Sequence, residues 1–256
     1  NCFSKKRSSN SAMRIKLFRI RSAAFIVRKG IFQFYCAIFL FINEPAVLLA
    51  QLAMRRGGGL SGLYQFHRLY EIRRILKAEQ VSSAIEFGSG ASSLLFNKYV
   101  ERFVSIEESE SWAGHYLEML TSINWFPGLK ANIVKLNMQI LPRLEFADST
   151  GELVCSYQIP NEISQMSFEL VYVDGPTSWI QTEVKGEIFI RDKEKLIPNI
   201  STMELSAMPR IILIDGRRAT VSYLIEKGKL GKARIRLRGT YREQSRVRPY
   251  HTSICS

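Results

Sequence analysis

The spacing of polar and apolar positions changes after residue 78. Before that point, residues 63–78 carry apolar side chains at helical spacing with cations on the other face, which predicts an amphipathic helix. After it, short apolar stretches alternate with helical ones. The predicted strands are 83–87, 102–107, 131–137, 168–174 and 210–215, and the predicted helices that follow the first two strands are 92–100 and 110–120.

Strands that alternate with helices are typical of an α/β fold with a parallel sheet. The stretches 168–174 and 210–215 are nearly all apolar, as expected of strands buried on both faces. In residues 233–239, arginines alternate with apolar residues, which predicts a half-buried antiparallel strand that closes the sheet edge. We therefore expect a doubly wound, mostly parallel sheet with an antiparallel edge strand near the C-terminus, preceded by N-terminal helices.

A glycine-rich linker at residues 55–62 separates an N-terminal segment from the predicted α/β domain. Those eight residues hold four glycines and a serine, so the domain is predicted to cover residues 63–256. Residues 1–12 are polar and basic and have the character of a leader or a disordered segment. Residues 13–56 are apolar and basic, and they are predicted to form helices that break at Asn43-Glu44-Pro45.

Two interpretations of residues 13–56 stay open. The helices either pack on the globular domain or on a second subunit, or they lie in one leaflet of a membrane through the apolar arms 31–42 and 46–54. Cations at 28–29 and 55–56 would then lie at the headgroups, as suits the inner, anionic face of the membrane. The longest uncharged apolar run has 12 residues, and a spanning helix needs about 20, so spanning is not expected.

Composition and charge limit the classes of partner that the protein is expected to bind. The chain is 46% hydrophobic, enough for a buried core, and its formal charge of +13 favours anionic partners such as phosphates, acidic lipids or charged sugars. The four cysteines show no zinc or disulfide spacing, which favours a reducing, cytoplasmic location. Residues 227–248 hold nine Lys or Arg against one acid, but few aromatic residues stand among them, so nucleic-acid binding is not expected.

Acidic side chains stand where predicted strands end. Glu86 precedes the turn Gly88-Ser89-Gly90 after the first strand, and Glu107 ends the second strand, 19 positions after Gly88. Apolar strands end likewise at Asp174 and Asp215. Because ligands of doubly wound sheets bind beyond the carboxyl ends of the strands, we expect these four carboxylates to rim one crevice.

The run E-F-G-S-G at 86–90, followed by a strand that ends in Glu107, resembles the S-adenosylmethionine-binding half of Rossmann-like class I methyltransferases. The strand ends "YVDGP" and "IDGRR" resemble the O-methyltransferase branch, which acts on small molecules and sugars. The resemblance covers about residues 70–241 and implies S-adenosylmethionine as cofactor. It implies that Glu107 holds the ribose hydroxyls and that Asn137 lies near the adenine. The residues implied for the methionine and ribose portion are Glu86, Gly88, Ser89 and Gly90.

The same resemblance implies an acceptor site. Asp174 matches a metal-binding aspartate of some O-methyltransferases, and Asp215 half matches a second, since Gly216 stands where the family has an amide. Oxygen ligands of this kind suit Mg²⁺. Asp174 and His251 are the candidate catalytic residues for methyl transfer to an oxygen of a small-molecule or saccharide acceptor. Few reactive side chains are required, because proximity and orientation carry most of such catalysis.

Two rival functions use the same features. An NAD(P)-dependent oxidoreductase would need the same glycine turn and the same acid after the second strand, although Glu86 would repel a pyrophosphate. A non-catalytic, membrane-peripheral scaffold on a Rossmann-like domain is the other rival. Either an enzyme or a scaffold of this kind is compatible with a homo-oligomer.

Overall fold

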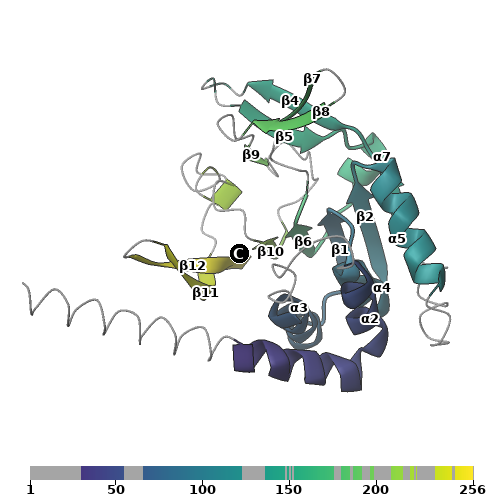
Figure 1. Cartoon of the computed structure of the whole chain (residues 1–256), viewed down its shortest axis with the longest axis vertical. Coiled ribbons are helices and arrows are strands. Elements are labelled where there is room, and N and C mark those ends of the chain that lie inside the picture. The colour runs from purple at the N-terminus through teal and green to yellow at the C-terminus, as the bar shows by residue number, and fades with distance from the viewer. Residues whose placement is uncertain are drawn as a thin grey trace, which may run out of the picture. The chain divides into compact units, whose positions relative to one another are not determined.

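The structure is a computed structural model that divides into two compact units, Asn1–Ile72 and Arg73–Ser256. Figure 1 shows the elements of both units. The predicted boundaries at residues 12–13 and 55–63 lie outside the described residues and stay predictions. The residues that the structure describes are 30–54, 66–122, 136–147, 149, 151, 153–175, 180–184, 187–191, 197–198, 209–215, 220–221, 223, 234–243 and 246–255.

The first unit contains a helix over residues 30–43, helix α2 (Pro45–Ala53) and the start of α3 (Phe66–Glu79). The break falls at Glu44, as predicted, because Pro45 lacks an N–H and is suited to the first turn of a new helix. The Glu44 N–H still donates to the Leu40 carbonyl at 2.6 Å, so the two helices follow each other without a loop. Among the described helices, none is long and apolar enough to cross a membrane.

The second unit is built on a seven-stranded sheet in the order β11-β12-β10-β6-β1-β2-β3. Strands β1, β2, β3, β6 and β10 are parallel, and helices α4 (Ala91–Tyr99) and α5 (Glu110–Ser122) follow β1 and β2. The bounds of the strands are β1 Ser83–Phe87, β2 Arg102–Glu107, β3 Met138–Ile140, β6 Leu170–Val173, β10 Ile211–Asp215, β11 Arg234–Glu243 and β12 Arg246–Cys255.

The sheet confirms the predicted α/β, Rossmann-like fold. Strand β11 is the edge strand, and it contains the predicted segment 233–239 except for its first residue. It is antiparallel to β12, and β12 is antiparallel to β10, so the chain ends in a hairpin on this edge. Of the third predicted strand, residues 136–137 are not part of a strand, because β3 begins at Met138. Residues 131–135 lie outside the described part, so that part of the prediction stays a prediction.

Alternate residues of the parallel strands face two different layers. Ile85 and Phe87 of β1 belong to a buried core with Val104 and Ile106 of β2. On the opposite face, Phe96 of α4 lies 5.6 Å from the ring of Tyr172 in β6, so α4 covers that face. This alternation decides which side chains of β1 can reach a site and which are enclosed.

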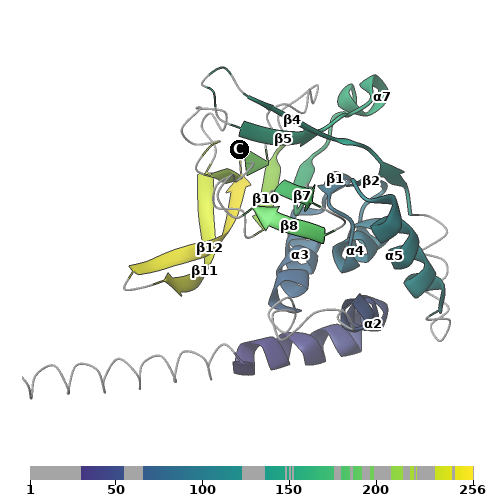
Figure 2. The ribbon, with the colours of Figure 1, turned by 45° about the horizontal axis from the view of Figure 1, so that its top comes forward.

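Smaller sheets lie outside the main one. Strands β4 (Arg143–Ala147) and β5 (Leu153–Tyr157) form an antiparallel pair, which Figure 2 shows side by side, and β9 (Ile197–Pro198) joins β5. The short helix α7 (Asn161–Ser164) follows β5. Strands β7 (Ile180–Val184) and β8 (Glu187–Arg191) form a separate hairpin. None of these strands was predicted from the sequence.

Candidate functional site

A cavity of about 810 Å³ lies at the carboxyl ends of β1, β2 and β6. This is the edge of the sheet where the sequence predicted a crevice, and the volume is typical of small-molecule sites. The described lining residues come from the β1–α4 turn, the β2–α5 connection, the β4–β5 pair and the residues after β6. The lining residues are Gly88, Ser89, Glu107, Glu108, Ser109, Trp112, Arg143, Tyr157, Asp174 and Gly175.

Two glycines allow the floor of the cavity to form. Gly88 has φ +90°, and a Cβ there would lie 2.7 Å from the backbone nitrogen of Gly175. A Cβ on Gly175 would lie 2.1 Å from the Tyr157 hydroxyl and 2.8 Å from the Gly88 nitrogen. The N–H groups of Asp174 and Gly175 both donate to the Phe87 carbonyl, at 2.8 and 2.6 Å. The β1 turn and the β6 turn are therefore in direct backbone contact, which no larger residue would permit.

The N–H groups of the glycine turn donate hydrogen bonds to acceptors within the protein. Gly88 donates to the Ile106 carbonyl at 2.8 Å, and Ser89 donates to the Glu107 carboxylate at 3.0 Å. Gly90 donates to the Ser93 hydroxyl at 3.0 Å. The turn thus does not present these three N–H groups to a phosphate, which is how glycine-rich turns bind dinucleotides.

Glu107 lines the cavity, as expected from its place at the end of β2. Besides Ser89, its carboxylate accepts from the N–H groups of Glu108 and Ser109, at 2.9 and 3.1 Å. Burial raises its pKa, and these hydrogen bonds oppose the rise. Three N–H groups occupy three of the about four acceptor positions of a carboxylate. Of these three hydrogen bonds, Oε2 accepts only the one from the Ser89 N–H. Oε2 is therefore the oxygen that can accept a further hydrogen bond from a ligand hydroxyl.

Helix α5 brings an aromatic ring to the cavity. The Ser109 hydroxyl accepts from the N–H of Trp112 at 3.1 Å and so caps the helix start. The Trp112 indole N–H donates to the Ser89 carbonyl at 3.1 Å, which holds the ring across the glycine turn. Sequence reasoning did not select Trp112. Its position, five residues after the acid that ends β2, was the available signal.

The β4–β5 pair supplies two further lining residues that the sequence did not reveal. Arg143 and Tyr157 are directly paired across these antiparallel strands, and both line the cavity. The Arg143 guanidinium lies 3.9 Å from the Glu108 carboxylate. The Tyr157 ring stacks on Phe87, with ring centroids 5.4 Å apart. No motif marks these residues, since they depend on a strand pair that the hydrophobic pattern did not predict.

Glu86 has a different place from the one expected. It is fully buried, it is not among the cavity residues, and it accepts from the hydroxyls of Ser92 and Ser93 at 2.5 Å and of Ser105 at 3.0 Å. Burial raises its pKa to about 8, which the serine hydrogen bonds oppose and the charge of Asp174 assists. The expectation that Glu86 rims the crevice is corrected, because its side chain lies on the sheet face that α4 covers.

Asn137 also lies away from the cavity. It precedes β3 instead of ending that strand, its side chain is exposed, and its carbonyl accepts from the Ser105 N–H at 2.9 Å. In the register of β2 and β3, Ile140 is the residue beside Glu107. The predicted place of Asn137 at the carboxyl end of the strand is therefore corrected by three residues.

The other predicted site residues lie at neighbouring strand ends. Asp174 lines the cavity directly after β6. Asp215 ends β10, next to β6, and its backbone pairs with that of His251 in β12. The side chains of Asp215 and His251 lie outside the described part, so a magnesium site and a catalytic base at these residues stay predictions. Within the described residues, no cluster of three metal-binding side chains is present.

No protein-family model matches the sequence. No curated protein matches it either. Among solved structures, the O-methyltransferase TomG from Streptomyces achromogenes, in complex with SAM, is 13% identical, with 83% of this chain and 90% of TomG covered and a TM-score of 0.46. The SAH-bound methyltransferase PaMTH1 from Podospora anserina is 12% identical, with coverages of 83% and 87% and a TM-score of 0.46.

An rRNA methylase from Streptococcus thermophilus is 9% identical to this chain. The match covers 73% of this chain and 95% of the methylase, with a TM-score of 0.39. All three TM-scores are below 0.5, so these similarities decide nothing about the function of this chain.

Proposed function

We propose that the protein is an S-adenosylmethionine-dependent methyltransferase that methylates an oxygen of a small-molecule or saccharide acceptor. The observation that carries the proposal is an acid-lined cavity beside a glycine turn whose N–H groups are used internally. Such a cavity favours a nucleoside with positive charge over one with a pyrophosphate.

The cavity residues fit this cofactor in charge. Among the described lining residues, Glu107, Glu108 and Asp174 contribute three carboxylates and Arg143 contributes one cation. S-adenosylmethionine carries a sulfonium and an ammonium, which carboxylates attract, whereas the pyrophosphate of NAD(P) would be repelled. A second observation weakens the oxidoreductase alternative. The N–H groups of Gly88, Ser89 and Gly90 all donate to acceptors within the protein, so they do not donate to a phosphate.

Five of the described lining residues have a definite task in the proposal. Oε2 of Glu107 accepts a hydrogen bond from a ribose hydroxyl, and Trp112 flanks the nucleoside. Asp174 attracts the positively charged part of S-adenosylmethionine and borders the acceptor. When bound, S-adenosylmethionine supplies a methyl group on a sulfonium, which is open to attack by an acceptor oxygen. The protein contributes proximity, orientation and the exclusion of water, and these effects require no reactive nucleophile of its own. Arg143 and Tyr157, from outside the main sheet, border the acceptor side.

Calorimetric titration of the full chain separates the proposed function from its rivals. S-adenosylhomocysteine and S-adenosylmethionine are expected to bind, and NADH is expected not to. Tight binding of NADH with no binding of S-adenosylhomocysteine would transfer the assignment to the oxidoreductase class. Binding of none of the three would leave the non-catalytic scaffold.

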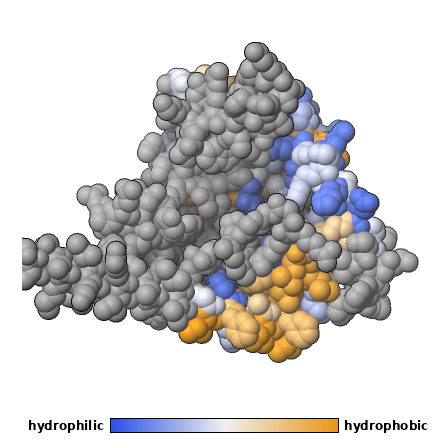
Figure 3. All heavy atoms as spheres, in the orientation of Figure 1, coloured by the Kyte–Doolittle hydropathy of each residue, from blue (hydrophilic) through white to orange (hydrophobic). Residues whose placement is uncertain are grey.

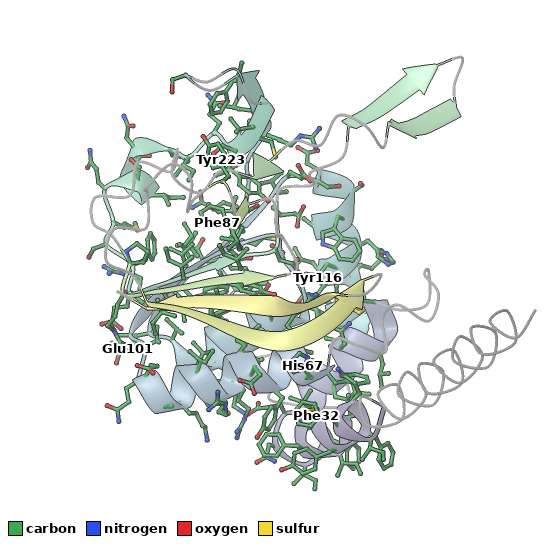
Figure 4. The ribbon with its side chains drawn as sticks, turned by 90° about the vertical axis from the view of Figure 1, so that its left-hand side faces the viewer. Phe32, His67, Phe87, Glu101, Tyr116 and Tyr223 are labelled. Atoms are coloured by element: carbon green, nitrogen blue, oxygen red, sulfur yellow. The ribbon has the colours of Figure 1, made fainter. Side chains whose placement is uncertain are left out.

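Glu107→Gln is expected to weaken the binding of S-adenosylhomocysteine about tenfold to a hundredfold, since a charge-assisted hydrogen bond to the ribose is lost. The matched control is Glu101→Gln. Glu101 is exposed just before the other end of β2, as Figure 4 shows, and the same loss of charge there should leave the dissociation constant unchanged. Equal dissociation constants for the two variants would remove Glu107 from the cofactor site.

A further inference from the structure

The helix over residues 30–43 is apolar on both of its faces. Between Gly30 and Asn43 the sequence has no charged residue. Gln33, Cys36 and Leu40 form the buried face, at positions i, i+3 and i+7. The opposite face is exposed, and its large side chains are between 43% and 71% accessible. This outer face consists of Ile31, Phe34, Tyr35, Ile38, Phe41 and Ile42.

Other faces of the helix make contacts within the first unit. The Phe32 ring lies 5.8 Å from the ring of His67, and Phe39 meets Tyr70 edge to face at 4.9 Å. The His67 N–H donates to the Gln33 side chain at 3.0 Å. Figure 4 shows Phe32 and His67 close together. On the outer face, Tyr35 also meets Tyr70 at 6.2 Å between ring centroids, and it stays 53% exposed. The large side chains of the outer face therefore remain largely accessible within the described residues.

An exposed apolar surface of this kind marks a binding surface. Single exposed apolar side chains are ordinary, but six on one helix face make a continuous patch. Figure 3 shows hydrophobic residues gathered at the bottom of the view, where Figure 1 draws this helix. The patch needs an apolar partner, and its aromatic residues suit an interface that is apolar on one side and wet on the other.

The charge of the same segment identifies the partner. Residues 1–56 contain eleven Lys or Arg and a single acid, Glu44, which is buried. Most of the net charge of +13 thus belongs to the segment that carries the outer face. Two copies of the chain would bring like charges together, which opposes self-association through this face. A surface that is both apolar and anionic complements the segment, and a bilayer with acidic lipids has both properties.

We propose that the outer face of helix 30–43 binds the surface of an anionic phospholipid bilayer and enters one leaflet without crossing it. A helix of 14 residues is about 21 Å long, shorter than the hydrocarbon core of about 30 Å. The apolar side chains of the outer face enter the boundary between headgroups and acyl chains. The Lys and Arg residues that neighbour the helix in the sequence neutralise lipid phosphates. This surface is independent of the proposed methyl transfer, since no cavity residue takes part in it.

The test is co-sedimentation of the full chain with vesicles, in the absence of any cofactor. Vesicles of phosphatidylcholine mixed with phosphatidylglycerol are expected to bind the protein, and vesicles of phosphatidylcholine alone are expected to bind it much more weakly. High salt should weaken the binding without abolishing it, because the apolar contribution is not screened. Equal binding to both vesicle types, or binding to neither, would overturn the proposal.

Variants test the outer face itself. Phe34→Ser and Phe41→Ser should each lower the partition onto anionic vesicles by roughly tenfold. Both side chains are about two-thirds exposed, at 69% and 65%, so the fold should tolerate the change. The control Phe34→Leu keeps an apolar side chain and should retain binding. In a Phe34→Trp variant, brominated lipid should quench more of the tryptophan fluorescence than it does in the parent, which has three tryptophans.

If the serine variants change only the oligomeric state in analytical ultracentrifugation and leave vesicle binding intact, the face binds a second copy and the proposal is wrong.

Discussion

Gly88→Ala is expected to lower the free energy of unfolding by about 3 kcal/mol or more and to prevent cofactor binding. The residue has φ +90°, a conformation that L residues rarely adopt. The new Cβ would also lie 2.7 Å from the Gly175 nitrogen and 2.9 Å from the Asp174 carbonyl carbon. Both neighbours are backbone atoms, so relief requires the ends of β1 and β6 to separate. That separation would break the hydrogen bonds from Asp174 and Gly175 to Phe87.

Gly114→Ala is the matched control for this variant. Gly114 lies in α5, is exposed, and a Cβ there would meet no atom within 4 Å. The same substitution should stabilise the protein by about 0.5 to 1 kcal/mol, because alanine is the better helix former. Urea denaturation of both variants measures the difference. Similar stabilities for the two variants would mean that the contact between the β1 and β6 turns does not constrain Gly88.

The pH dependence of stability is expected to carry a large contribution from Glu86. Burial raises the pKa of this carboxyl from 4.5 to about 8. Between these values the folded protein keeps a proton that the unfolded chain releases, so the free energy of unfolding falls as pH rises across this window. The decrease should be on the order of a few kcal/mol. Glu107, whose pKa is also raised by burial, contributes in the same direction.

Glu86→Gln should flatten this dependence, because the glutamine is neutral at every pH and still accepts from the serine hydroxyls around it. Relative to the parent, the variant should be more stable above pH about 8 than it is at pH about 5. Urea denaturation across this pH range measures both proteins. A constant difference between them at all pH values would show that Glu86 keeps its charge when folded.

Much of the fold could be predicted from hydrophobic spacing. Strands β1, β2, β6 and β10, with helices α3, α4 and α5, lie where the spacing placed them, because each must bury an apolar face or stripe. Glu107 and Asp174 could also be placed, since parallel strands share one carboxyl edge. The β4–β5 pair could not, because its two strands depend on each other across a connection and their pattern alone is weak.

Glu86 shows why the candidate site could be predicted only in part. From the sequence, one can predict that side chains of β1 alternate between the two faces of the sheet. Which of these faces the following helix covers cannot be predicted from the sequence. In the structure, Glu86 lies beside Ser105 and Tyr172 in the register, on the face covered by α4. Asn137 was misplaced for a related reason, since the register of β3 was taken from an apolar run that precedes the strand.

The described lining of the cavity comes from two sheets that share one buried core, since Tyr157 of β5 stacks on Phe87 of β1. Strands β1, β2 and β6 carry the turn, Glu107 and Asp174, while Arg143 and Tyr157 stand on a separate sheet. In the proposed function, Arg143 borders the acceptor, and this residue is not part of the buried core that supports the cofactor side. Substitutions at Arg143 should therefore change which acceptor the proposed enzyme prefers and leave its affinity for S-adenosylhomocysteine intact.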